Sequence, residues 1–224
     1  AQGALADAAT QPGDLGTAAA ADATDFATAA QGAKADSAAQ VKGSNLSRFI
    51  ARAKSGDALV VTGLGDSIMA GTGATPGTND YMTLVEDGLA SRFPAASFSF
   101  INRSVSGYTM AALGVYGNIA AALADEADLY IVSIGRNDVV ADGAAYAGMP
   151  VQGYRLPQSM RAVEAFIREV RRIVPQADIL IHAENPASVY ATDSDLRAYN
   201  AALSRLAAAY GCEFTDGYGA FVAA

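Results

Sequence analysis

Five short apolar runs alternate with longer stretches of helical periodicity between residues 58 and 215, and this alternation constrains the fold most. Each run is rich in Val, Ile, Leu or Phe and is brief enough for a strand. The expected strands are Ala58–Gly63, Ser97–Asn102, Leu129–Ile134, Ile179–Ala183 and Glu213–Thr215. Strands that alternate with helices predict a parallel sheet covered on both faces, with functional residues at the C-terminal ends of its strands.

The segments between these runs predict helices at Asp80–Arg92, Met110–Asp125, Pro157–Val174 and Asp193–Tyr210. A shorter amphipathic helix is expected just before the first strand. Its apolar residues at helical spacing are Leu46, Phe49, Ile50 and Ala53. Ser44 or Asn45 is the expected N-cap of this helix, and Gly56 the expected stop.

Residues 1 to about 43 have a different character, because Ala, Gly, Asp, Thr and Gln dominate and large apolar side chains are scarce. Such a segment cannot build a core of its own. Phrases such as TAAQGAKADSA, residues 28–38, resemble the degenerate repeats of phage tail-fibre shafts, which become ordered as trimers. The resemblance implies a stalk that makes a homotrimer and contacts other phage tail proteins. A disordered linker is the alternative.

Charge and composition argue against several classes of partner and cofactor. The formal net charge is -8 and Lys and Arg form no cluster, so nucleic acid is not an expected partner. No apolar run approaches the ~18 residues that span a bilayer, so no membrane partner is expected. Cys212 is expected as a buried, inert thiol, and one histidine with one cysteine predicts no metal site. Gly63-Leu64-Gly65 lacks the third glycine of a dinucleotide fingerprint, so no cofactor is expected.

The first expected strand ends in a serine-bearing turn, Gly63 to Gly71. Ser67 would lie exposed at the strand edge, which is a nucleophile's position. Alone, Gly-Asp-Ser also fits a serine that caps a turn. Asp66 is expected to hold this turn through Asx-type hydrogen bonds, as is Asp138 in the turn after the third strand.

Two further segments strengthen the case, because each also follows a strand. They are Asn102–Thr109, which contains Gly107, and Ser133–Val139, which contains Asn137. In this order, the three segments resemble the first three conserved blocks of the SGNH (GDSL-type) hydrolases. Over residues 44–224, the resemblance implies a flavodoxin-like three-layer α/β/α sandwich with a five-stranded parallel sheet of order 2-1-3-4-5. It also implies Ser67 as nucleophile, with the Ser67 and Gly107 N–H groups and the Asn137 amide as oxyanion hole.

The base that such hydrolases use is a histidine in an Asp-x-x-His block beyond the fifth strand. Three residues after Asp216 this chain has Gly219, so the block is missing, and we expect the chain to stop before it and before the closing helix. His182, the single histidine, fits a core or rim residue with a satisfied hydrogen bond. It could alternatively be a substitute base oriented by Glu184.

The favoured hypothesis is a serine esterase on a phage tail fibre, exposed on the virion, that removes O-acetyl groups from host surface polysaccharide. Its activity depends on the missing base. A degenerate SGNH head that binds a receptor or serves a structural role is the alternative, and a free-standing cellular esterase is a third hypothesis.

Overall fold

A computed structural model of the chain describes residues 45–139, 145–146, 149–150, 156–183 and 193–217. The strands are β1 (Ala58–Gly65), β2 (Ser97–Asn102), β3 (Leu129–Ser133), β4 (Ala145–Tyr146), β5 (Met149–Pro150), β6 (Asp178–His182) and β7 (Glu213–Thr215). The helices are α4 (Ser47–Ser55), α5 (Tyr81–Arg92), α6 (Met110–Val115), α7 (Asn118–Ala124), α8 (Leu156–Ile173) and α9 (Asp193–Tyr210). The predicted stalk, residues 1–43, lies outside the described residues.

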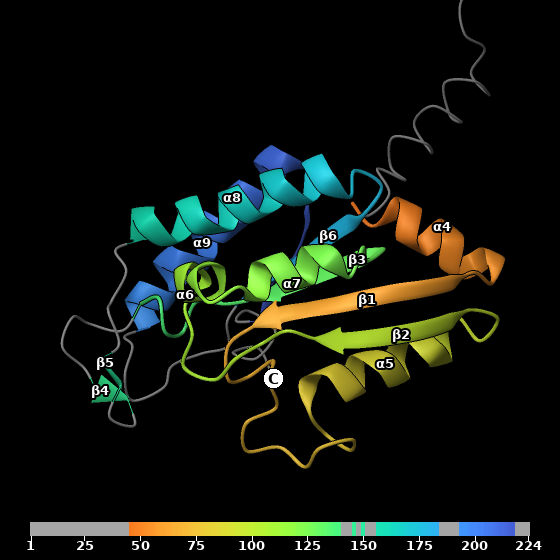
Figure 1. The fold of residues 1–224 in the computed structure, drawn as a ribbon, viewed down its shortest axis with the longest axis horizontal. Coiled ribbons are helices and arrows are strands. Elements are labelled where there is room, and N and C mark those ends of the chain that lie inside the picture. Colours follow the sequence, from red (N-terminus) through yellow and green to blue (C-terminus); the bar gives the residue numbers. More distant parts are fainter. Residues whose placement is uncertain (1–44, 140–144, 147–148, 151–155, 184–192, 218–224) are drawn as a thin grey trace, which may run out of the picture. The chain divides into compact units, whose positions relative to one another are not determined.

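Five strands form one parallel sheet in the order β2-β1-β3-β6-β7 (Figure 1). Counted along the chain, this is the predicted order 2-1-3-4-5, and the three-layer α/β fold is confirmed. The strand order reverses at β1, which pairs with β2 on one side and with β3 on the other. Ligands of open α/β sheets bind beyond the C-terminal ends of the strands at such a point.

Side chains that alternate along the strands pack in two separate hydrophobic cores. Leu129 and Ile131 of β3 pack in a core that includes residues of α4 and α5. Tyr130 and Val132 pack on the other face, in a core that includes residues of α6, α7, α8 and α9. Tyr130 meets Phe166 of α8 edge-on, with ring centroids 5.8 Å apart. Both faces of the sheet are therefore covered, which explains why the β3 strand is apolar throughout.

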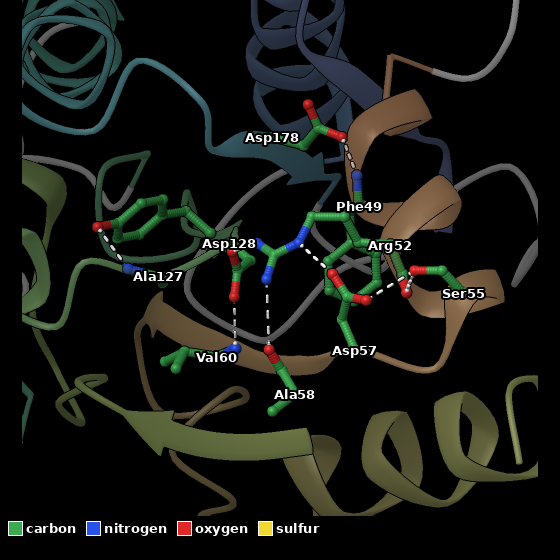
Figure 2. A network of polar contacts seen from close by, with 10 residues as sticks. Phe49, Arg52, Ser55, Asp57, Ala58, Val60, Ala127, Asp128 and Asp178 are labelled. Carbon is green, nitrogen blue, oxygen red and sulfur yellow. Dashed lines mark hydrogen bonds and ion pairs between the residues drawn. The ribbon is translucent and has the colours of Figure 1, made fainter. Parts of the chain in front are cut away.

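Helix α4 is held by polar contacts to the beginnings of the strands (Figure 2). The Phe49 N–H donates to Asp178 Oδ2, at the start of β6, over 2.9 Å. Arg52 pairs with Asp57, directly before β1, at 2.8 Å, and with Asp128, directly before β3. These contacts tie one helix to the N-terminal edge of the sheet, opposite the edge where the site is expected.

The contacts of Asn45 extend this attachment to the last strand. Its backbone N–H donates to Glu213 Oε2 over 2.6 Å, and its side-chain amide donates to the Cys212 carbonyl over 2.8 Å. Glu213 is the first residue of β7. Together, α4 and Asn45 therefore contact the beginnings of β1, β3, β6 and β7.

Two local predictions were wrong, and one pair of strands was not predicted at all. The α4 N-cap is Leu46, which makes no side-chain capping bond, and Asn45 lies one residue before it, where its side chain donates to the Cys212 carbonyl. The helix predicted over Met110–Asp125 is two helices, because Gly117 adopts a left-handed φ of 85° that interrupts it. The antiparallel pair β4 and β5 was not predicted. Gly56 ends α4 as predicted, in the left-handed region.

Within the described residues, no helix is both long and apolar enough to cross a membrane.

Candidate active site

The segments that follow β1, β2 and β3 are hydrogen-bonded to one another at the C-terminal edge of the sheet. The Asp66 N–H donates to the Ser133 carbonyl over 3.3 Å, and the Val105 N–H donates to the Gly65 carbonyl over 3.0 Å. The Asn137 side-chain amide donates to the Tyr108 carbonyl over 2.9 Å. The three predicted blocks therefore meet at the point where the strand order reverses.

Close packing at the end of β1 shapes the turn that carries Ser67. A Cβ added at Gly65 would lie 2.3 Å from the Ser133 carbonyl oxygen and 2.8 Å from Met69 Cβ. Only glycine lets β1 approach β3 this closely. Asp66 Oδ1 accepts the Ile68 N–H over 3.0 Å, which is the predicted Asx-type bond. Ser67 follows, partly exposed, and its carbonyl accepts the Thr72 N–H over 2.9 Å.

The loop after β2 presents Gly107 in a turn of its own. Gly107 has a φ of 81°, in the left-handed region, and no described atom lies within 4 Å of an added Cβ. The turn is closed by the Tyr108 N–H, which donates to the Val105 carbonyl over 3.2 Å. Thr72 Oγ1 and Ser106 Oγ lie 2.6 Å apart, so this loop also contacts the Ser67 loop.

Asn137 is buried, with 7% of its surface exposed, and its amide is fixed by the Tyr108 carbonyl. An amide nitrogen carries two hydrogens, so one N–H remains for a second acceptor. The same contact joins the third block to the second, because Tyr108 follows Gly107 directly.

Two buried carboxyl groups flank these residues. Asp138 Oδ1 accepts the Ser159 hydroxyl of α8 over 2.5 Å, and Ser159 also bonds to the Tyr199 hydroxyl at 2.8 Å. The prediction of a local Asx-type bond was therefore incomplete for Asp138, because its partner Ser159 lies 21 residues further along the chain. Ser159 and Tyr199 were missed, because nothing in a helical serine or tyrosine marks a contact made only by tertiary packing.

Neither carboxyl group is fully satisfied among the described residues, because Asp66 Oδ2 and Asp138 Oδ2 lack hydrogen-bond partners there. Burial raises the pKa of Asp66 to about 6 and that of Asp138 to about 7. The negative charge of Asp66 contributes to the raised pKa of Asp138, which shows that the two groups are electrostatically linked.

His182 ends β6 and is enclosed on several sides. Its Nδ1 lies 2.8 Å from Thr215 Oγ1, and its ring centroid lies 5.6 Å from that of Tyr81. A Cβ added at Gly217 would lie 2.6 Å from both Cε1 and Nε2 of the ring. Burial lowers the pKa of His182, although Asp216 acts in the opposite direction. Burial therefore favours the neutral form of the ring relative to an exposed histidine. Glu184, the predicted alternative partner, lies outside the described residues.

His182 and the Ser67 turn lie apart along the sheet edge. Gly65, Ser133 and His182 are register partners on β1, β3 and β6. Two strand spacings, about 10 Å, separate His182 from Gly65. No hydrogen bond joins His182 to Ser67 in the described part of the chain.

This arrangement suits acyl transfer. A partly exposed hydroxyl and a buried amide donor lie on adjoining turns at one sheet edge. A preorganised donor of this kind stabilises the oxyanion of a tetrahedral intermediate. Among the described residues, no three His, Cys, Asp or Glu side chains are grouped so that they could hold a metal ion.

Comparisons with known proteins point to the same chemistry. The model of the GDSL-like Lipase/Acylhydrolase family matches residues 64–224. No curated protein is significantly similar to the chain in sequence.

Solved structures with the same fold include Axe2, an acetylxylan esterase from Geobacillus stearothermophilus. The TM-score is 0.60 at 18% identity, over 73% of this chain and 78% of that chain. A second is a two-domain esterase active on acetylated mannans, co-crystallised with mannopentaose. Its TM-score is 0.56 at 22% identity, over 76% of this chain and 41% of that chain.

Proposed function

Because this chain belongs to the GDSL-like lipase/acylhydrolase family, we propose that it is a serine esterase with Ser67 as its nucleophile. The observation that carries the proposal is the meeting of the three loops, in which the Asn137 amide donates to the carbonyl of the residue after Gly107. The family alone would leave the acting residues open, whereas this contact joins two of the three predicted segments directly.

In the proposed reaction, Ser67 Oγ attacks the carbonyl carbon of an ester and its proton passes to a base. The carbonyl oxygen becomes an oxyanion, which accepts hydrogen bonds from the free Asn137 N–H and from the backbone N–H groups of Ser67 and Gly107. When this intermediate collapses, the base returns its proton to the departing oxygen, so that the alcohol leaves and an acyl-serine remains. Water then attacks the acyl-serine and gives up a proton to the base, which returns it to Ser67 Oγ as the carboxylic acid is released.

The proposed substrate is an O-acetylated polysaccharide of a host cell surface. The solved esterases that share the fold, with their acetylated xylan and mannan substrates, support the choice of acetyl esters of sugars. The composition of residues 1–43 supports a setting on a phage tail fibre, exposed on the virion and trimeric through that segment. The net charge of -8 favours an uncharged polymer, because a polyanion would be repelled.

The test is acetate release from p-nitrophenyl acetate and from acetylated xylooligosaccharides. Ser67→Ala should abolish turnover without unfolding the domain, because the partly exposed turn tolerates loss of one oxygen. Asn137→Ala should lower kcat by about 10² to 10³ with a smaller effect on KM. Hydrolysis that survives Ser67→Ala would contradict the mechanism.

Asn118→Ala is the matched control for Asn137→Ala. The Asn118 amide also donates to a backbone carbonyl, that of Arg103, over 3.3 Å, but it lies outside the proposed oxyanion hole. This variant should keep the activity. An equal loss in both variants would mean that loosening the loop, and not loss of an oxyanion donor, lowers the rate.

The base is tested separately with His182→Ala. Since Thr215 is hydrogen-bonded to one ring nitrogen of His182 and Gly217 lies close to the other, we expect whatever hydrolysis depends on Ser67 to be the same in this variant as in the wild type. Loss of hydrolysis in both Ser67→Ala and His182→Ala would make His182 the base.

A second function is favoured by one observation: no described side chain is hydrogen-bonded to Ser67 as a base would be. A serine triad without its base keeps only about 10³ to 10⁴ of rate over water. The domain would then be a degenerate head that binds polysaccharide without turnover. Binding of acetylated oligosaccharides without release of acetate would support this function over the esterase.

A further inference from the structure

An exposed aromatic surface adjoins the candidate site. Val115 and Tyr116 are the two most exposed large hydrophobic side chains of the described residues, at 76% and 68%. They lie at the C-terminal end of α6, the helix that begins directly after the Gly107 loop and its cap, Thr109. Two neighbouring exposed apolar side chains next to a functional edge are a candidate contact surface for a ligand.

Tyr116 is held in place by a second tyrosine. Its ring lies against that of Tyr108, with centroids 5.2 Å apart and planes tilted by 38°. Tyr108 is itself partly buried and packs against the core that contains α6 to α9. The pair, called here the Tyr108–Tyr116 platform, therefore presents one fixed and one exposed aromatic ring.

The platform is connected to the proposed oxyanion hole through a single residue. The Tyr108 carbonyl accepts the Asn137 amide over 2.9 Å, while the Tyr108 ring supports Tyr116. A ligand group on Tyr116 would therefore rest on a ring that is supported by Tyr108, the same residue whose carbonyl positions Asn137. Helix α6, which lies between the Gly107 loop and Tyr116 in the chain, is only about 9 Å long for its six residues, and this is within the length of a short oligosaccharide.

We propose that the Tyr108–Tyr116 platform binds a sugar ring of the polysaccharide whose acetyl group enters the site. A pyranose presents a face of C–H groups with partial positive charge, which packs on the negative face of an aromatic ring. The Tyr116 hydroxyl adds a hydrogen-bonding group for the sugar's own hydroxyls. The substrate class rests on the proposed function, but the binding itself does not require turnover.

A second copy of the chain is a weaker explanation for this surface. Stable interfaces bury about 800 Å² on each partner, whereas Val115 and Tyr116 are only two exposed side chains. The acidic net charge, -8, also favours an uncharged sugar over an anionic polymer.

The experiment compares Tyr116→Ala, Tyr116→Phe and Tyr116→Leu. The ratio of kcat/KM for acetylated xylooligosaccharides to that for p-nitrophenyl acetate should fall about three- to tenfold in Tyr116→Ala. Tyr116→Phe, which keeps the ring, should retain most of the ratio. Tyr116→Leu keeps an apolar side chain without a ring and should lose it.

Leu84→Ala is the control, because Leu84 is another exposed apolar side chain, 55% exposed, on α5. This variant should behave as the wild type on both substrates.

Binding is measured independently by calorimetric titration of deacetylated xylo- and mannooligosaccharides into Ser67→Ala protein. When Tyr116→Ala is added to Ser67→Ala, the Kd should rise by the same three- to tenfold. An unchanged Kd, or no binding of either sugar by Ser67→Ala protein, would overturn the platform. A change in oligomeric mass in Tyr116→Ala, with sugar binding unaffected, would instead assign the surface to self-association. Absence of turnover with this binding intact would overturn the esterase alone.

Discussion

At the scale of single residues, Asp138 is the group whose charge most affects stability near the site. Its pKa in the folded chain, about 7, lies above the ordinary value of 3.8, because burial disfavours the carboxylate. The folded state therefore binds the proton more tightly than the unfolded state. Its contribution to stability is complete below about pH 4 and is lost as the pH rises to about 7.

Asp138→Asn should remove this loss. We expect a smaller decline in the free energy of unfolding between pH 4 and pH 7 than in the wild type, measured by urea denaturation at several pH values. The amide oxygen can still accept the Ser159 hydroxyl, so the network with Tyr199 is retained.

Asp80→Asn is the control, because the contribution of Asp80 to stability changes with pH in the opposite direction. Hydrogen bonds from Thr83 and Gly77 lower the pKa of Asp80, so the stability that it contributes is lost as the pH falls through its folded-state pKa. Identical pH dependence of unfolding in wild type and Asp138→Asn would contradict the prediction.

Sequence reasoning placed individual residues well where a strand end dictated the position. Ser67, Gly107 and Asn137 follow β1, β2 and β3, and parallel strands bring their C-terminal ends to one edge. It could not find Ser159, because the position of α8 against the Asp138 turn depends on the packing of the whole core. The role of each site residue stays a prediction until variants are measured.

At the scale of elements, α4 is a helix whose packing should contribute strongly to the free energy of unfolding. Phe49 is 2% exposed, packs in the core beneath the sheet and meets Phe98 of β2 at a ring distance of 6.0 Å. Phe49→Ala should reduce the free energy of unfolding by about 3 to 5 kcal/mol. Urea denaturation checks this value.

Leu84→Ala again supplies the comparison, because an exposed leucine should change stability by less than about 0.5 kcal/mol. A loss below about 1 kcal/mol in Phe49→Ala would show that α4 is only loosely attached to the domain.

The helices and strands were predictable because their hydrophobic periods are strong, whereas their ends and contacts were not. The helix over 110–125 was predicted as continuous, since its apolar pattern runs through Gly117 and only the left-handed backbone there breaks it. The existence of α4 followed from its apolar spacing. The contacts of α4 with the starts of β1, β3 and β6, and of Asn45 with the start of β7, could not be predicted, because they depend on strand order and on charges distant in sequence.

At the scale of the whole molecule, the prediction concerns residues 1–43. Their small side chains permit close approach of three chains, and a short isolated segment of this composition is not stable in water. Light scattering should give a trimer for the full chain and a monomer when residues 1–43 are removed. A full chain that remains monomeric would contradict the stalk hypothesis and favour a linker.

The attachment of α4 has a mechanical consequence for a protein tethered through its N-terminus. Asn45, the first residue that the structure describes, is hydrogen-bonded to Cys212 and to Glu213 at the start of β7. A pull on the preceding chain is therefore transmitted into the strand beginnings through α4 and its contacts. The turns with Ser67 and Asn137 lie at the other ends of the strands, so the contacts that would first take up tension on such a tether are separate from those that shape the site.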